Sequence, residues 1–118
     1  MSIQPHEIPR LEWQRFLDDL TEEHAGDEVT IEVLDEQLGD HDEVQRLPLA
    51  YVEYDPKDDA VIVGVGGRDG RFPVVLRDII EQPQRVLADA IGNDARLALE
   101  IAAADGSQTI VTLHRPSA

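Results

Sequence analysis

The sequence has no cysteine and few aromatic residues, lysines or long apolar runs. Without cysteine, disulfides, thiolate metal ligands and cysteine nucleophiles are excluded. Aromatic residues make up 4% of the chain, so a core has to be built mainly from Val, Ile, Leu and Ala. No apolar stretch approaches the roughly 18 residues of a membrane-spanning helix, and the first residues lack the basic and apolar regions of a signal peptide. We therefore expect a cytoplasmic protein.

Negative charge dominates what is present. The 118 residues include 25 acidic and 10 basic side chains, a formal net charge of −15 at pH 7, and Lys57 is the one lysine. Such a charge repels nucleic-acid phosphates and anionic membrane surfaces, so we expect neither as a partner. Two interpretations of the acidity remain open. It either keeps a small domain in solution or reflects adaptation to a salty, halophile-like cytoplasm.

One amphipathic helix is predicted from about Pro9 to Ala25. Proline suits the first helical turn, and Gly26 is placed to end the helix in a left-handed conformation. Acidic side chains occupy the other faces of this segment. The apolar residues recur at the helical spacing i, i+3, i+4 and i+7, as Trp13, Phe16, Leu17 and Leu20.

After Gly26 the apolar period changes to two, which predicts β-strands. The acidic segment at residues 35–43 is interpreted as a loop, and Pro48 favours a strand start or an edge strand. Turns are predicted at residues 55–59, 64–70, 82–83, 92–94 and 105–106, where Gly, Pro and Asp gather. Seven short strands fit between these signals, at about residues 29–33, 47–54, 60–65, 74–80, 84–88, 97–101 and 109–114.

These connections are too short for parallel crossovers, so neighbouring strands should be antiparallel. We predict one α+β domain over residues 8–115, preceded by a flexible tail over residues 1–7. In it the N-terminal helix packs on a 6–7-stranded antiparallel meander. The sheet has an aliphatic face that must be covered, so it is expected to curl into a partly closed small barrel with the helix as its cap.

The order of these features resembles an uncharacterised prokaryotic family, domain of unknown function family 5335. The similarity covers roughly Ile8 to His114. It implies one domain, and it implies no activity, cofactor or catalytic residue. The segments that carry it are Ile8-Pro9-Arg10, Trp13 and Phe16, Gly26, residues 29–33, Leu47-Pro48-Leu49, Tyr54-Asp55, the glycine-rich hairpin, residues 79–86, Leu99-Glu100-Ile101, Ala104-Asp105-Gly106 and Thr109.

No pattern in the sequence predicts a catalytic residue, a cofactor site or a metal site. The glycine-rich residues 64–70 follow a strand, but no helix follows them to hold a phosphate, so we interpret them as a hairpin. Residues 40–43 place acids consecutively and do not match the alternating ligands of a calcium loop. The four histidines, His6, His24, His41 and His114, are scattered along the chain.

Arg77 and Arg85 are the candidate anion-binding residues. They fall on adjacent predicted strands on either side of Pro83, and guanidinium groups suit carboxylate or phosphate. The alternative is that each arginine forms an ion pair with a nearby acid of the same chain.

Three functional hypotheses follow. The first is a non-catalytic interaction or regulatory module that binds a protein partner or itself through a strand edge. The second is a small-ligand (anion) binding domain or weak enzyme that uses the barrel mouth. The third is a salt- or stress-adapted accessory protein.

Overall fold

The computed structural model of the chain describes residues 6–35, 39–66, 74–90 and 95–114. In these ranges one α-helix and eight β-strands form, which confirms the α+β prediction. The eighth strand is β1, to which His6 and Glu7 of the predicted tail contribute. The elements are β1 (His6–Ile8), η1 (a 3-10 turn, Arg10–Glu12), α1 (Trp13–His24), β2 (Glu28–Asp35), β3 (Gly39–Asp55), β4 (Ala60–Gly66), β5 (Val74–Glu81), β6 (Pro83–Ala90), β7 (Ala95–Ala103) and β8 (Gln108–His114).

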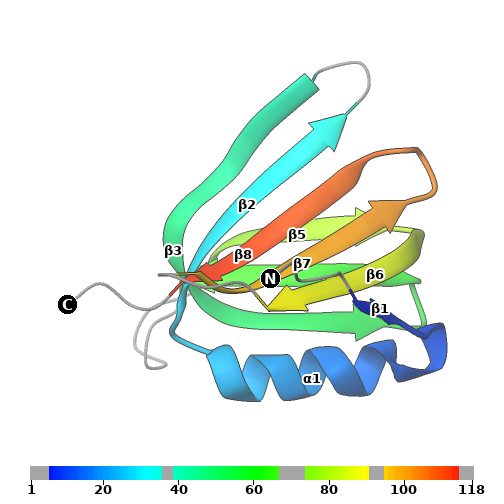
Figure 1. Ribbon diagram of the computed structural model, residues 1–118, viewed down its shortest axis with the longest axis horizontal. Coiled ribbons are helices and arrows are strands. Elements are labelled where there is room, and N and C mark those ends of the chain that lie inside the picture. Colours follow the sequence, from blue (N-terminus) through cyan, green and yellow to red (C-terminus); the bar gives the residue numbers. More distant parts are fainter. Residues whose placement is uncertain (1–5, 36–38, 67–73, 91–94, 115–118) are drawn as a thin grey trace.

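All eight strands belong to one antiparallel sheet, in the order β1-β6-β7-β8-β2-β3-β4-β5 (Figure 1). Two meanders, β2 to β5 and β6 to β8, are joined because β8 pairs with β2, which places His114 opposite Glu28. The sheet does not close into a barrel, since β1 and β5 form its two edges. At Gln82 the backbone turns with φ of 51°, and β6 then pairs with β1 and β7 and not with β5.

The 17-residue strand β3 divides its length between two partners. It pairs with β2 as far as Pro48, opposite Glu28, and from Leu49 onward it pairs with β4. Register shifts interrupt both ladders, and such irregularities bend a strand. Figure 1 shows β3 descending from the β2–β3 hairpin, far from the helix, to a course beside α1. Pro48 therefore lies inside a strand, so its prediction as a strand start is wrong. The edge alternative holds locally, because the part of β3 that ends at Pro48 pairs with β2 and the pairing with β4 begins at Leu49.

The loop predicted at residues 35–43 is also largely strand. β2 extends to Asp35 and β3 begins at Gly39, with His41 opposite Val33 and Asp40 opposite Leu34. Backbone hydrogen bonds stabilise this hairpin, and the strand propensity of acidic residues depends strongly on context. The turn predicted at residues 92–94 and the end of that at 64–70 lie outside the described residues, while Gly64 and Gly66 belong to β4.

Helix α1 packs against the second part of β3, where β2 has ended. Trp13 and Leu17 are fully buried, and each such side chain stabilises the fold by roughly 1.5–3 kcal/mol. Gly26 adopts the predicted left-handed conformation, with φ of 93°, and its N–H donates to the carbonyl of Leu49. Farther along β3, the Thr21 hydroxyl accepts a hydrogen bond from the N–H of Val52 at 2.8 Å and donates one to the carbonyl of Val52 at 2.7 Å. Beyond Pro48, where β2 no longer pairs with β3, the helix thus supplies hydrogen bonds that a neighbouring strand would otherwise make.

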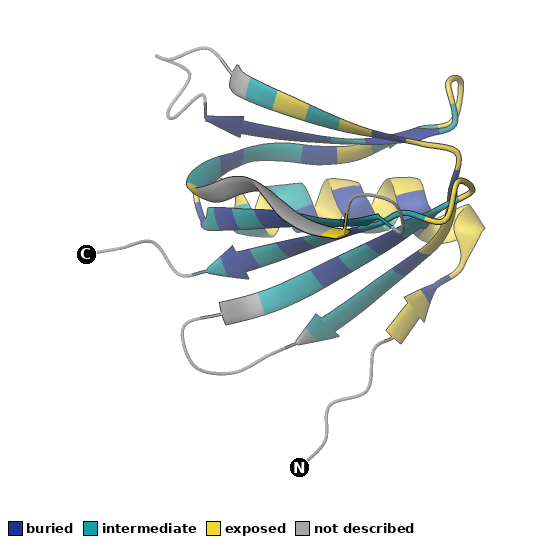
Figure 2. Ribbon diagram, turned by 90° about the horizontal axis from the view of Figure 1, so that it is seen from above, coloured by how far each residue is buried: buried dark blue, intermediate teal, exposed yellow. Residues whose placement is uncertain are grey.

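The core lies between the two layers of the bent sheet and the helix. Buried residues alternate with partly buried ones along β8 and the first half of β2 (Figure 2), as period-two patterning requires, whereas β4 is buried at nearly every position. No described helix has the length and apolar composition needed to cross a membrane. The largest fully buried side chains of the described residues are aliphatic apart from Trp13: Leu17, Val29, Ile31, Val52, Val61, Val63, Val65, Val86, Leu99, Ile101 and Leu113.

Candidate interaction surface

A groove of about 620 Å³ runs along α1 on the side that faces β7. Its apolar side chains are Phe16 and Leu20 from the helix and Leu97 from β7. The helix packs closely on β3 and leaves this second flank open, so Phe16 and Leu97 remain half-buried. Apolar residues that stay partly exposed along an open groove gain stability when a partner covers them, and such patches mark interaction sites.

Charged side chains border the groove. Glu12, Asp19 and Glu23 contribute three carboxylates and Arg15 one guanidinium, which gives this lining a formal charge of −2 with His24 neutral. The imidazole of His24 contacts Asp27, with Nδ1 at 2.9 Å from Oδ2, and Glu23 more distantly at 3.7 Å. The border is therefore acidic around an apolar strip.

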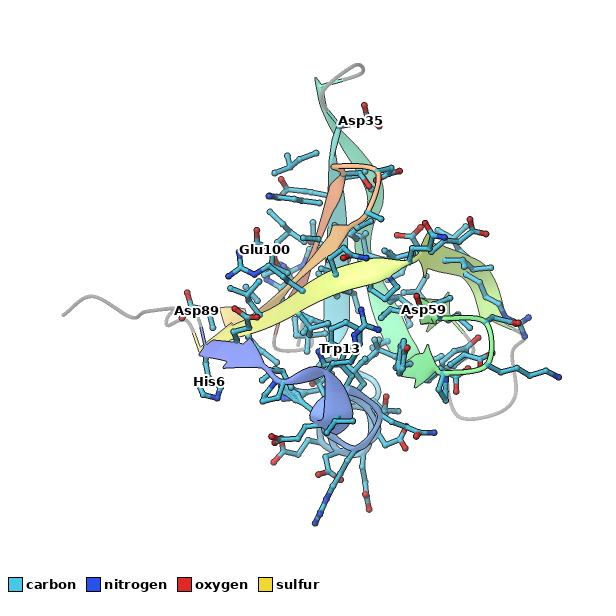
Figure 3. All side chains as sticks on the ribbon, turned by 90° about the vertical axis from the view of Figure 1, so that its right-hand side faces the viewer. His6, Trp13, Asp35, Asp59, Asp89 and Glu100 are labelled. Atoms are coloured by element: carbon cyan, nitrogen blue, oxygen red, sulfur yellow. The ribbon has the colours of Figure 1, made fainter. Side chains whose placement is uncertain are left out.

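A second polar cluster joins η1 to two turns of the sheet. The guanidinium of Arg10 donates to the carbonyl of Pro83 at 2.9 Å and to Asp59 Oδ1 at 3.3 Å. It also lies 4.3 Å from the ring centre of Trp13, in cation–π geometry. Figure 3 shows Trp13 between the helix and the strands, and Asp59 at the turn before β4. Arg10 thus connects the helix start with the β3–β4 turn and the β5–β6 corner.

Tyr54 is part of the same cluster. Its hydroxyl donates to Asp59 Oδ1 at 2.8 Å, and its ring meets Trp13 edge-on with centres 5.2 Å apart. The hydrogen bond to the Asp59 carboxylate, assisted by desolvation, raises the pKa of Tyr54 above its ordinary value. A raised phenol pKa keeps the Tyr54 hydroxyl protonated, so it remains a hydrogen-bond donor to Asp59.

The two candidate arginines lie on consecutive strands that are not paired with each other. Arg77 is exposed on the edge strand β5, opposite Gly64 of β4. Arg85 is exposed on β6, where its guanidinium forms an ion pair with Glu7 of β1 at 2.9 Å. Neither arginine lines the α1 groove or the smaller pocket beside β5.

That smaller pocket, about 230 Å³, lies between β5 and the β7–β8 turn. Its oxygen-bearing side chains include Asp78, Asp105, Ser107 and Thr109. Asp105 is engaged within the turn, because the Ser107 hydroxyl and N–H donate to its carboxylate at 2.7 and 2.9 Å. These bonds lower the pKa of Asp105 below its ordinary value.

The histidines stay apart where their side chains are described. His6 is exposed on β1, His24 ends the helix, and His114 on β8 lies 3.1 Å from the Thr30 hydroxyl. Within the described ranges no three His, Asp or Glu side chains gather in a way that could hold a metal ion. The side chains of residues 40–43 fall outside the description.

Comparison with known proteins gives a match to a family of unknown function (DUF5335) over residues 4–118. The chain belongs to this family. A segment of 52 residues is 42% identical to an uncharacterised protein of Aquifex aeolicus (strain VF5). That segment covers 44% of this chain and 47% of the relative, so the match spans about half of that protein. No solved structure matches the chain.

Sequence reasoning missed both the groove and the Arg10 cluster. Phe16 was assigned to the apolar stripe of the helix, and nothing local shows that it lies at the margin of that stripe, next to Leu97. A sequence pattern that points to the groove is the row of acids Glu12, Asp19 and Glu23, which recur at the helical period on the face next to the apolar stripe. For Arg10, Asp59 and Pro83 the separation along the chain hides the contact.

Proposed function

We propose that this domain is a non-catalytic interaction module that binds a basic, amphipathic segment of a partner protein along α1. The observation that carries this proposal is the groove between α1 and β7, with its apolar strip and acidic border. Phe16 and Leu97 supply apolar surface that remains half-exposed in the free domain. Covering such surface is favourable at roughly 25 cal/mol per Å² of apolar area.

The shape of the groove suits an elongated segment. The helix residues that line it recur at helical spacings from Glu12 to His24, so the groove follows the whole length of α1. Twelve helical residues span about 18 Å, which is about the length of three turns of a partner helix. Helices that bind in grooves insert apolar side chains at i, i+3, i+4 and i+7.

The charge of the border selects the partner. Three carboxylates against one guanidinium attract lysine or arginine side chains that flank the apolar row of the partner. The formal charge of −15 on the chain adds a longer-range attraction for basic segments. Because both effects are electrostatic, binding should weaken as salt is added.

A synthetic peptide tests the proposal. The probe is an amphipathic peptide of about 18 residues, with leucine at i, i+3, i+4 and i+7 and lysine at flanking positions. A peptide of the same composition in scrambled order is its control. Isothermal titration calorimetry should show binding of the amphipathic peptide and weaker binding of the scrambled one. Substituting Phe16→Ala should weaken the amphipathic complex about tenfold, as loss of an apolar anchor does.

Matched charge variants separate the groove from the general acidity of the chain. The groove variant combines Glu12→Gln, Asp19→Asn and Glu23→Gln. The control variant removes three exposed carboxylates elsewhere, with Asp18→Asn, Glu53→Gln and Asp58→Asn. We expect the groove variant to bind the peptide at least several-fold more weakly than the control variant. Equal weakening in both, or an unchanged affinity for Phe16→Ala, would show that the peptide does not occupy the groove.

A further inference from the structure

The edge strand β5 offers a second surface, separate from the α1 groove. β5 pairs with β4 along one side, and no other strand of the described residues pairs with it. Its free side therefore presents backbone N–H and C=O groups that another strand can bind. Residues 76–81 of β5 are described with their side chains, and at Gln82 the chain turns away.

The outward side chains of β5 form a row of three different kinds. Arg77, Ile79 and Glu81 all point away from the core, and Ile79 is 56% exposed, which is unusual for an isoleucine. Ile79 continues the apolar surface of its neighbour Ile62 on β4. On the inward face, between Leu76 and Ile80, lies Asp78, which is opposite Val63 of β4.

This row is complementary to itself. When two copies of β5 lie antiparallel with Ile79 opposite Ile79, Arg77 of each copy is opposite Glu81 of the other. The two apolar residues then meet at the centre, and an opposite-charge pair flanks them on each side. Directly opposed apolar and opposite-charge pairs are the arrangements that stabilise antiparallel strands. A two-fold axis relates the copies, so the same patch serves both.

Other registers are less favourable. A shift of one residue would bring inward side chains opposite outward ones, which a sheet with one buried face does not tolerate. A shift of two residues one way places Asp78 opposite Asp78, and like charges in that position are destabilising. The same shift the other way places Ile79 opposite Glu81 and leaves Arg77 beyond the end of the partner strand.

From this pattern we infer that β5 is a self-association edge, through which two copies of the chain join their sheets with Ile79 at the centre. The ladder covers about five residue pairs, far less than the roughly 1,600 Å² of a standard stable interface, so the dimer is weak and concentration-dependent. The formal charge of −15 on each copy opposes association at low salt, and screening of that repulsion favours the dimer.

Sedimentation equilibrium of the full chain tests this inference. Measurements run from about 10 μM to about 1 mM at about 0.15 M salt, where the Debye length is about 8 Å. The wild type should form a dimer within this range. Arg77→Glu or Glu81→Arg alone should weaken it about tenfold, because each change sets like charges opposite one another twice. Both changes together restore the opposite pairs and should restore the dimer.

Mixing the two single variants gives a second readout. In a mixture of Arg77→Glu and Glu81→Arg chains, every flanking pair across a mixed dimer is of opposite charge. The mixture should therefore associate more strongly than either variant alone. Both residues are exposed, so folding is expected to persist, and fluorescence of the buried Trp13 checks it.

A wild type that stays monomeric up to about 1 mM would overturn the inference. So would a double variant no stronger than the singles, which would assign any dimer to another surface or register. Titration of the same samples with the amphipathic peptide keeps the two surfaces apart. A wild type that stays monomeric but binds the peptide refutes only β5 pairing, and a wild type that forms the dimer but does not bind the peptide refutes only the α1 groove.

Discussion

Thr21→Val tests whether the helix truly substitutes for a missing strand beside β3. The hydroxyl of Thr21 contacts both backbone groups of Val52, at 2.7 Å to the carbonyl and 2.8 Å to the nitrogen. Valine has nearly the same shape and a similar helix propensity, so the substitution removes the hydrogen bonds and little else. Val52 itself is 1% exposed.

The expected cost follows from those two groups. A buried donor or acceptor left without a partner costs roughly 1–3 kcal/mol. Thr21 is half-buried, so water partly replaces the hydroxyl, and the lower end of that range applies to each group. We expect the free energy of unfolding to fall by about 2 kcal/mol in Thr21→Val.

Urea denaturation followed by tryptophan fluorescence measures this change. Trp13 is the one tryptophan of the chain and is 1% exposed, so its emission reports on the packing of α1. With a urea dependence of about 2 kcal/mol per M, the midpoint should fall by about 1 M. Thr21→Ser keeps the hydroxyl and loses one methyl group, so its midpoint should fall by less than half as much. If Thr21→Val unfolds at the same urea concentration as Thr21→Ser, the two hydrogen bonds do not stabilise the contact between α1 and β3.

Two further predictions concern Tyr51 and Tyr54. Gly64→Ala would place a Cβ 2.5 Å from Cε1 of Tyr51, so it should lower the free energy of unfolding by about 1–3 kcal/mol. In a urea double-mutant cycle, a Tyr51→Val background should remove most of that cost. Equal costs in both backgrounds would refute the clash. Asp59→Asn should lower the pKa of Tyr54 toward its ordinary value, measured by phenolate absorbance in a Tyr51→Phe background. A phenol pKa raised by folding contributes stability that is fully present below the unfolded pKa of about 10 and is lost as pH rises through the folded pKa. Asp59→Asn should therefore reduce this loss of stability at alkaline pH. An unchanged Tyr54 titration would contradict the assignment.

Local patterns predicted the secondary structure well where one face is buried. The stripe of Trp13, Leu17 and Leu20 marks the helix, and alternating Leu97, Leu99 and Ile101 mark β7, because burial on one side imposes a period. β1 and the far part of the β2–β3 hairpin lack such a period. β1 is held by backbone pairing with β6, which is distant in sequence, and the hairpin is held by pairing between β2 and β3 themselves. Composition reveals neither pairing.

The order of the strands depends on contacts between distant residues. Nothing near Gln82 shows that β6 joins the sheet beside β1, leaving β5 as an edge. The candidate surfaces share this dependence. Phe16 and Leu97 are separated by most of the chain, and their proximity follows from the way β3 bends around the helix. The outward row of Arg77, Ile79 and Glu81 was visible as an alternation, but its freedom to bind was not.

The pairing of β2 with β8 has a consequence for the order of folding during synthesis. The meander from β2 to β5 can form once residue 81 has emerged, whereas β8 ends at His114. Until β8 has been synthesised, the side of β2 that pairs with it has no partner strand, and pairing between strands so far apart in sequence is slow. Glu32 pairs opposite Ile110 of β8, and its charge discourages pairing of β2 with other nascent chains before β8 arrives.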